Sequence, residues 1–385
     1  MSIFKRYKIY DNEKCPCGSG KRYFECCKNR KDKVVKDKIP LDVKIVNNFR
    51  GSLFKCCMYP DKTKCVKHIK NAHALQNNKI ISALAVDGHV CMLNHKKKPI
   101  IVPIENNEVE VLTLVDYVGV NHATTFNCFC DVHDDEVFAP IEKGAPDFDI
   151  NSAEQKYLYA YKAFIFEYYK EKVHQRSLQK IIKEKPSILK EKFFIKEFRN
   201  LNIKLNEMES IKTFFDNGLV NRDFSGVQTC VVTLPEAIKF ANYSYIGLNY
   251  DLKGKKIKNI KNNFMHPLFL TIFPEKNQSY IIIGCLDKHK KTYDKFLKQL
   301  NSCNIDVIKY YFTLVLPLYS ENIVLSPTLW ESWNEKIQMA FTFYCNRQGS
   351  QFTIYNTIVK WGLKNLKRKN INLKDGNRGK IDLFI

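Results

Sequence analysis

The uneven distribution of cysteine constrains this chain more than any other feature of its sequence. Ten of its fourteen cysteines lie within the first 130 residues, and six of its nine histidines lie between residues 68 and 133. Thiols and imidazoles gathered in one third of a large chain are typical of metal binding, because the reducing cytosol disfavours disulfides. The four later cysteines are scattered among apolar residues, as packed core thiols are.

The first cysteine group occupies residues 15–27, which read CPCGSGKRYFECC and have the spacing C-x-C-x8-C-C. Four thiolates within so short a segment can complete a tetrahedral shell around zinc at about 2.3 Å per bond. The turn at residues 18–20, Gly-Ser-Gly, allows the second cysteine pair to return to the first. A shell of four thiolates is closed to water, so we expect a structural metal site here and not a catalytic one.

This segment resembles the SEC-C motif, a small zinc-binding module also found at the C-terminal tail of the bacterial secretion motor ATPase. The resemblance covers residues 11–30 and is carried by the cysteine spacing and by the interior Pro-Cys-Gly-Ser-Gly-Lys. It implies a structural zinc ion and docking on partners that include protein and ribosomal surfaces. The zinc ligands that the resemblance implies are Cys15, Cys17, Cys26 and Cys27.

A second region rich in cysteine and histidine begins at residues 56–78 and resumes at residues 119–142. We predict a second zinc site here, with β-hairpins of residues 79–118 as the scaffold between its halves. Two alternatives stay open, namely reduced thiols buried in a β-rich core and a reactive, redox-active cysteine. The predicted ligands of this second zinc ion are Cys57, Cys65, Cys128 and Cys130.

Two short stretches of this second region, residues 71–76 and 133–135, carry groups that are able to catalyse a reaction. A histidine beside carboxylates can act as a general base, or can help to hold a divalent ion that activates water. Cysteine pairs that frame a histidine-bearing turn also resemble the zinc-stapled HNH nuclease fold. If the protein is such a nuclease, the candidate catalytic residues are His73, His133 and Asp134, and the cofactor is Mg²⁺ or Mn²⁺. The alternative is that His73 caps a helix and His133 supports a turn.

The pattern of apolar residues predicts an α+β fold in three consecutive domains. These are a zinc module with its linker at 1–38, a β-rich Cys/His domain at 39–150, and a mixed helix and strand domain at 151–385 that ends in a basic tail. Asp87-Gly88 between two apolar runs predicts a hairpin turn. The remaining predicted elements are strands at 80–93, 99–104, 109–115, 227–234, 267–273 and 280–286, and helices at 154–182, 287–300 and 329–344.

The long helix after Asn151-Ser152 carries a stripe of tyrosines. Such a stripe is more often a core face than a surface on which nucleic-acid bases stack between lysines, so we expect these rings to be buried. The tyrosines of the stripe are Tyr157, Tyr159, Tyr161, Tyr168 and Tyr169.

Charge is distributed in blocks along the 385 residues, whose net charge is +22. Residues 1–70 carry 19 Lys/Arg and 7 Asp/Glu, a net of +12, whereas residues 105–154 carry one Lys and 12 acidic residues, a net of −11. From Lys360 onward, eight basic and two acidic residues give +6. Such blocks can be solvated faces or can neutralise one another, but the excess also favours attraction to polyanions.

The sequence excludes several classes of protein. It has no P-loop, no dinucleotide-binding glycine motif and no nucleophile elbow, which argues against P-loop ATPases, classical dinucleotide enzymes and α/β-hydrolases. It has neither a signal peptide nor a run of about 18 apolar residues, so we expect a soluble cytoplasmic protein with no membrane partner. Its richness in Lys, Asn and Ile suggests an AT-rich, bacterial genome.

Three functions remain open. The first is a zinc-binding protein that docks on nucleic acid, a ribosome or another nucleoprotein or protein partner through a basic surface. The second is a metal-dependent, HNH-like nuclease that acts as a bacterial toxin or phage-defence effector. The third is an adaptor related to secretion or chaperone function. The sequence leaves the oligomeric state undetermined.

Overall fold

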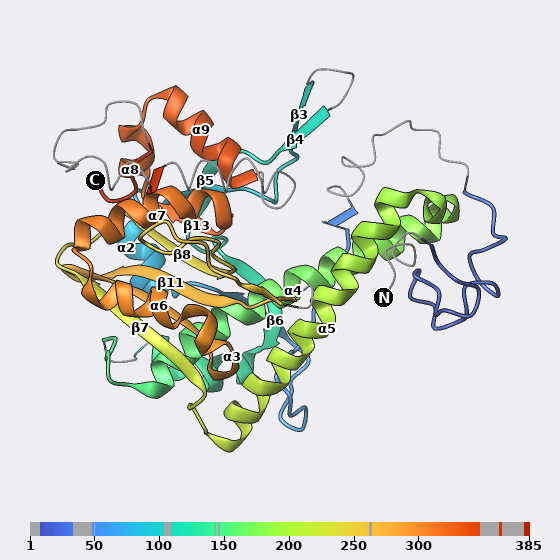
Figure 1. Cartoon of the computed structure of the whole chain (residues 1–385), viewed down its shortest axis with the longest axis horizontal. Coiled ribbons are helices and arrows are strands. Elements are labelled where there is room, and N and C mark those ends of the chain that lie inside the picture. Colours follow the sequence, from blue (N-terminus) through green and yellow to red (C-terminus); the bar gives the residue numbers. More distant parts are fainter. Residues whose placement is uncertain are drawn as a thin grey trace. The chain divides into compact units, whose positions relative to one another are not determined.

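The protein has an α+β fold, as predicted (Figure 1). The computed structural model describes residues 8–33, 48–49, 51–103, 109–142, 144, 147–261, 264–346, 362–363 and 381–385. No helix in this described part is long and apolar enough to cross a membrane. Most of the predicted basic tail and half of the predicted linker at 28–38 lie outside the described residues.

The helices and strands are labelled in chain order. The α-helices are α2 (Ser82–Leu84), α3 (Asp131–Phe138), α4 (Ala153–Glu184), α5 (Lys192–Asn221), α6 (Lys290–Ser302), α7 (Ile305–Tyr319), α8 (Pro327–Ser332) and α9 (Glu335–Asn346). Shorter π- or 3₁₀-helical segments are η2 (Asn77–Ile81), η4 (Ala139–Ile141), η5 (Pro186–Lys190) and η6 (Asp287–His289). The strands are β1 (Ile69–His73), β2 (His89–Leu93), β3 (Ile100–Pro103), β4 (Val109–Leu112), β5 (Val115–Gly119), β6 (Thr125–Cys130), β7 (Val227–Leu234), β8 (Phe240–Ile246), β9 (Ile260–Lys261), β10 (Phe264–Met265), β11 (Leu268–Glu275), β12 (Gln278–Leu286) and β13 (Ile323–Leu325).

The chain divides into two compact units that interleave along the sequence. Unit 1 comprises residues 1–55, 98–111 and 167–214, and unit 2 comprises residues 56–97, 112–166 and 215–385. The divisions at residues 166 and 214 fall inside α4 and α5, so each of these helices contributes to both units. The consecutive domains predicted from the sequence, with boundaries at 38 and 150, stay a prediction.

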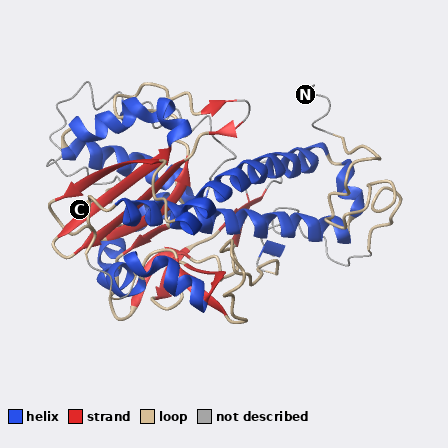
Figure 2. Ribbon diagram, turned by 90° about the horizontal axis from the view of Figure 1, so that it is seen from below, coloured by secondary structure: helices blue, strands red, loops and turns tan. Residues whose placement is uncertain are grey.

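Unit 2 is built around a seven-stranded sheet with the order β5-β2-β13-β8-β11-β12-β7. Every neighbouring pair in this sheet is antiparallel. Strand β8 is buried along its whole length and β11 along all but its last residue, which is typical of central strands covered on both faces. Figure 2 shows these strands side by side with helices packed against them.

Alternate residues of β11 point to opposite faces of this sheet, as the pleat requires. Leu268 and Leu270 join the apolar cluster that includes residues of α6 and α7. Phe269 faces the other way, and its ring centroid lies 5.3 Å from that of Phe215 in α5 and 6.4 Å from that of Phe164 in α4. The sheet of unit 2 is therefore the middle of three layers.

In unit 1, residues 167–184 of α4 pack on residues 192–214 of α5, and polar pairs join the two helices. The Lys204 ammonium lies 2.5 Å from the Glu171 carboxylate, and Gln175 donates to the side-chain oxygen of Asn202 at 2.8 Å. Burial opposes ionisation of Glu171, but Lys204 and His174 outweigh it and lower the pKa of Glu171 to about 2. This pair therefore stabilises the helix packing while Glu171 is ionised.

Most elements predicted in the second half of the chain are confirmed. Strands β7, β11 and β12 and helix α4 lie where the sequence placed them, and the tyrosine stripe of α4 is buried, as a core face is. Asp87 and Gly88 both have positive φ, 47° and 72°, as a two-residue hairpin turn requires.

Three predicted elements are wrong in part. The strand predicted at 109–115 is interrupted, because β4 ends at Leu112 and β5 begins at Val115. Residues 80–84 are helical rather than a strand, because this short apolar run places Ile80, Ile81 and Leu84 on one buried side at helical spacing. The helix predicted at 329–344 is two helices, since α8 ends at Ser332 and α9 begins at Glu335.

The aromatic layer under the sheet predicts a large effect for Phe215, which is 0% exposed. We expect Phe215→Ala to lower the free energy of unfolding by about 3–5 kcal/mol, through lost burial and the cavity left behind. Met339→Ala, at a position that is 73% exposed, is the matched control and should change it by less than about 0.5 kcal/mol. Chemical denaturation measures both, and equal effects would contradict the packing described here.

The lowered pKa of Glu171 predicts that the folded protein loses stability in acid. A group whose folded pKa lies below its ordinary value of 4.5 contributes stability above that value, and this contribution is lost as the pH falls toward about 2. Because the Lys204 side chain is 41% exposed, we expect Glu171→Gln to cost only about 2 kcal/mol near neutral pH. The difference in the free energy of unfolding between variant and wild type should shrink in denaturation experiments at falling pH. A constant difference would contradict a stabilising role for ionised Glu171.

Candidate metal centres

Turns and one short bridge position the N-terminal cysteines. Lys14 and Arg22 form an antiparallel bridge, and the chain between them reverses through Gly18 and Gly20, whose φ angles are +75° and +77°. Left-handed backbone of this kind costs glycine little, so the Gly-Ser-Gly turn predicted from the sequence is used as expected. The reversal returns the second cysteine pair to the first.

The four cysteine sulfurs of this turn form a group that can hold a metal ion. The sulfurs of Cys15, Cys17, Cys26 and Cys27 all lie within 4.8 Å of one another. The Cys17 and Cys26 sulfurs are 3.5 Å apart, and those of Cys26 and Cys27 are 3.8 Å apart. In a tetrahedral zinc site with bonds of about 2.3 Å, neighbouring sulfurs are separated by about 3.8 Å. The group already has nearly these dimensions.

The N-terminal segment has almost no apolar core besides these thiols. Within residues 8–33, the buried residues are Ile9, Cys15, Pro16, Cys17 and Cys27. A segment of this size with one buried aliphatic side chain needs another source of stability, which a structural metal supplies in many small modules.

The proton affinities of the cysteines reflect their crowding. Burial raises the pKa of Cys15 to about 11. At Cys17 burial acts in the same direction, but hydrogen bonds with Ser19, Cys15 and Cys26 outweigh it and lower the pKa to about 7. One thiolate shared among protonated neighbours avoids the repulsion of several like charges. A divalent cation removes this repulsion and allows all four thiols to ionise.

A second complete donor set lies in unit 2 and consists of Cys57, Cys65, Cys130 and His133. The Nδ1 atom of His133 lies 3.4 Å from the sulfur of Cys57, 3.5 Å from that of Cys65 and 3.2 Å from that of Cys130. A tetrahedral zinc site with typical Zn–S and Zn–N bonds separates sulfur from nitrogen by about 3.6 Å. Three sulfurs and one nitrogen therefore surround a common point.

Backbone hydrogen bonds bring the parts of this second group together. The N–H of Met58 donates to the carbonyl of Cys128 in β6 at 2.8 Å, which holds the segment with Cys57 beside that strand. Cys130 ends β6, and His133 lies in the first turn of α3, three residues later. The ring of Tyr59 stacks on that of His133, with centroids 4.3 Å apart, and fixes the plane of the imidazole.

The protonation of this second group also suits metal binding. Burial lowers the pKa of His133, which favours the neutral imidazole that coordinates metals. Burial opposes ionisation of Cys130, but hydrogen bonds with the backbone of His133 and Val66 outweigh it, and the pKa of Cys130 is lowered. The pKa of Cys65 is raised to about 11 by burial and by its neighbour Cys57.

The structure corrects one ligand predicted from the sequence, since His133 and not Cys128 completes the second group. Cys128 is 0% exposed, and burial raises its pKa well above the ordinary value, as expected of a core thiol. The reason for the difference is the start of α3, where residues three apart share a face. The spacing Cys130-x-x-His133 was the available signal in the sequence, but the predicted ligand set contains the pair Cys128-x-Cys130 instead.

The three predicted catalytic residues have separate contacts. Nδ1 of His133 belongs to the metal-ligand group, so this histidine is not free to act as a base when a metal is bound. His73 lies in β1, where its Nδ1 is 2.9 Å from the carbonyl oxygen of Ala123 and burial lowers its pKa. Asp134 is buried, and its carboxylate lies 3.1 Å from the Lys70 ammonium.

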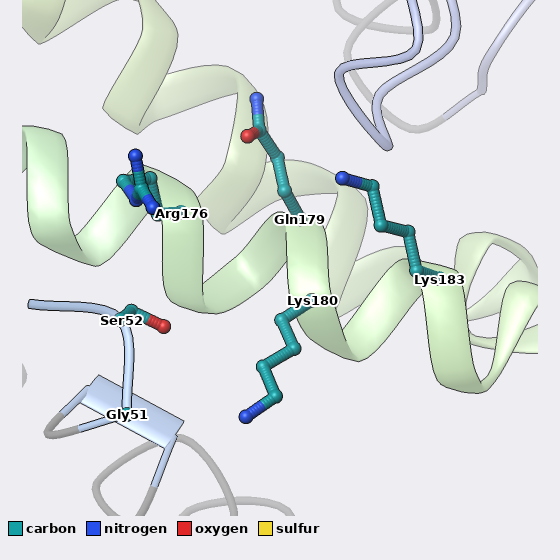
Figure 3. A pocket seen from close by; sticks show the side chains of 6 residues that line it. All are labelled: Gly51, Ser52, Arg176, Gln179, Lys180 and Lys183. Atoms are coloured by element: carbon teal, nitrogen blue, oxygen red, sulfur yellow. The ribbon is translucent and has the colours of Figure 1, made fainter. Parts of the chain in front are cut away.

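A cationic hollow of about 300 Å³ in unit 1 was not predicted from the sequence. Figure 3 shows Lys180 extending from α4 toward the segment that carries Gly51 and Ser52. The other residues that line the hollow are Arg176, Gln179 and Lys183 of α4. The signal in the sequence was the spacing of the three cations at i, i+4 and i+7, which places them on one helix face.

Comparisons with protein-family models, with curated proteins and with solved structures found no match for this chain.

The second group predicts different metal contents for two cysteine variants of the same strand. Cys128 and Cys130 are both 0% exposed and lie two residues apart. We expect Cys130→Ser to lose one equivalent of metal and several kcal/mol of stability, because metal binding and folding are coupled. Cys128→Ser should keep its metal and lose only about 1–3 kcal/mol for a buried hydroxyl. Elemental analysis and denaturation measure both effects, and equal metal contents would contradict the assignment.

Proposed function

We propose that this protein binds two structural zinc ions and docks on nucleic acid, alone or within a nucleoprotein, through exposed cations. The observation that carries the first half of this proposal is the pair of complete donor sets, one with four sulfurs and one with three sulfurs and a nitrogen. Sets of this composition and tetrahedral size suit zinc, whereas magnesium, calcium and manganese prefer oxygen ligands.

A structural role for both metals follows from the number of protein ligands. Each group supplies four, which fills a tetrahedral shell and leaves no position for a reacting water. The first group also has the cysteine spacing that resembles the SEC-C motif, whose role is structural and in docking. Because His133 belongs to the second ligand set, the nuclease hypothesis is less well supported than the binding hypothesis.

Charge supports nucleic acid as the partner. The net charge of +22 favours polyanions at long range, and the first 70 residues carry 12 of these excess charges. In the N-terminal module, Lys14, Lys21 and Arg22 are exposed beside the first cysteine group. In the described part of the chain, none of these three cations has an ion-pair partner. They are therefore available for phosphate.

The proposal predicts binding that weakens steeply with salt. Measured by fluorescence anisotropy with a labelled oligonucleotide, the logarithm of the affinity should fall linearly with the logarithm of the salt concentration. The slope is about −0.9 per phosphate contacted on a duplex and about −0.7 on a single strand. Lys14→Gln combined with Lys21→Gln should reduce this slope, while the metal content stays that of the wild type. Failure to bind DNA and RNA at low salt would overturn the proposed partner.

A further inference from the structure

The end of α4 in unit 1 presents a row of cations that the metal sites do not explain. Arg176, Lys180 and Lys183 are exposed, and together with Gln179 they cover a face about 100° wide. Seven residues of helix span about 10 Å along the axis. Within the described ranges, none of the three cations has a carboxylate partner, although other lysines of the same helices do, such as Lys172 with Glu209.

The opposite wall of the hollow is a fixed turn. The N–H of Ser52 donates to the carbonyl of Phe49 at 3.0 Å, and the Ser52 hydroxyl donates to the carbonyl of Asn48 at 2.6 Å. Gly51 lies close to the row, since a Cβ at its position would lie 3.3 Å from the Nζ atom of Lys180. The turn therefore encloses one side of the cationic row (Figure 3).

An aromatic ring beside the row holds its arginine in place. The guanidinium carbon of Arg176 lies 4.6 Å from the ring centroid of Phe54. Phe54 is itself fixed by Tyr169, whose hydroxyl donates to the Phe54 carbonyl at 2.6 Å and whose ring lies 5.0 Å away. A guanidinium supported on a ring is oriented in advance, so less side-chain entropy is lost when it binds an anion.

The first metal group contacts the same helix. Gly18, within the cysteine turn, approaches Gln179 so closely that a Cβ there would lie 2.8 Å from the side-chain amide. Arg30, beyond the last cysteine, donates to the carbonyls of Ile182 at 3.3 Å and Lys183 at 2.7 Å. The N-terminal module therefore packs on the end of α4 that carries the hollow.

We propose that this hollow binds successive phosphates of a nucleic-acid backbone. The inference rests on the proposed function and names its site. An arginine fork, two lysines and an amide are the donors that phosphates take. The row extends about 10 Å along the axis of α4, well beyond the rise of about 3.4 Å per nucleotide of a duplex strand, so it is long enough to contact more than one phosphate. The adjoining aromatic ring favours nucleic acid over an acidic peptide, because basic grooves with aromatic rings are typical of single-strand sites.

The test compares two triple variants with equal changes of charge. Arg176→Gln, Lys180→Gln and Lys183→Gln together remove the row, and Lys190→Gln, Lys192→Gln and Lys196→Gln remove three exposed cations elsewhere in unit 1. Both proteins should keep the wild-type metal content and circular dichroism, which shows that they fold.

We expect the first variant to bind a single-stranded oligonucleotide about tenfold more weakly. This factor is what the loss of three exposed ion pairs with phosphate would produce together. Its salt slope should become shallower by about 2, at about 0.7 per lost contact. The control variant should stay within about twofold of the wild type, since charges outside the site act only at long range and are screened.

The outcomes separate this inference from the function on which it rests. If both variants weaken binding equally, the site is wrong while nucleic-acid binding stands. If poly-glutamate displaces the oligonucleotide as effectively as unlabelled oligonucleotide at equal charge, the partner is an acidic protein and the inference fails. If the wild-type protein binds no nucleic acid, both the function and the site are overturned.

Discussion

The repulsion among clustered thiolates is the interaction on which the rest of the N-terminal structure depends. Four sulfurs within 4.8 Å cannot all be ionised without a cation, yet three of the four cysteines are among the five buried residues of 8–33. A bound metal would convert this repulsion into the main source of stability of the segment. In unit 2 a metal held by the second group would do the same between β6 and α3, next to a large apolar core. The first group would thus stabilise one short segment, whereas the second would join two elements of a larger unit.

The same chain combines two groups of metal-binding side chains with a large apolar core. The sheet of unit 2 is covered on both faces and needs no metal to bury its side chains, whereas the N-terminal module has one aliphatic residue buried. The exposed cations at the end of α4 belong neither to the metal-binding groups nor to the apolar core. Lys183, in the last turn of α4, interacts favourably with the helix macrodipole, which stabilises this cation of the row while it has no carboxylate partner. A cation without a carboxylate partner is also what phosphate binding requires.

The sequence predicted what local patterns determine. Strands β11 and β12, helix α4 and the hairpin at Asp87-Gly88 follow from periodicity and turn chemistry, and the first cysteine group follows from spacing within one short segment. The second group joins residues 57 and 133, so its fourth ligand depended on how β6 ends and α3 begins. Cys128 and Cys130 are equally buried, and only the fold, which places the sulfur of Cys130 beside His133, separates them. The hollow was missed because Gly51 and Ser52 meet α4 only in the folded chain.

The most direct test of the central claim is the metal content of the purified protein combined with X-ray absorption at the zinc edge. We expect two zinc ions per chain that share seven sulfur ligands at about 2.3 Å and one nitrogen at about 2.0–2.1 Å. One zinc ion per chain with sulfur ligands only would contradict the second centre. Oxygen ligands in the shell would contradict the claim that both centres are closed.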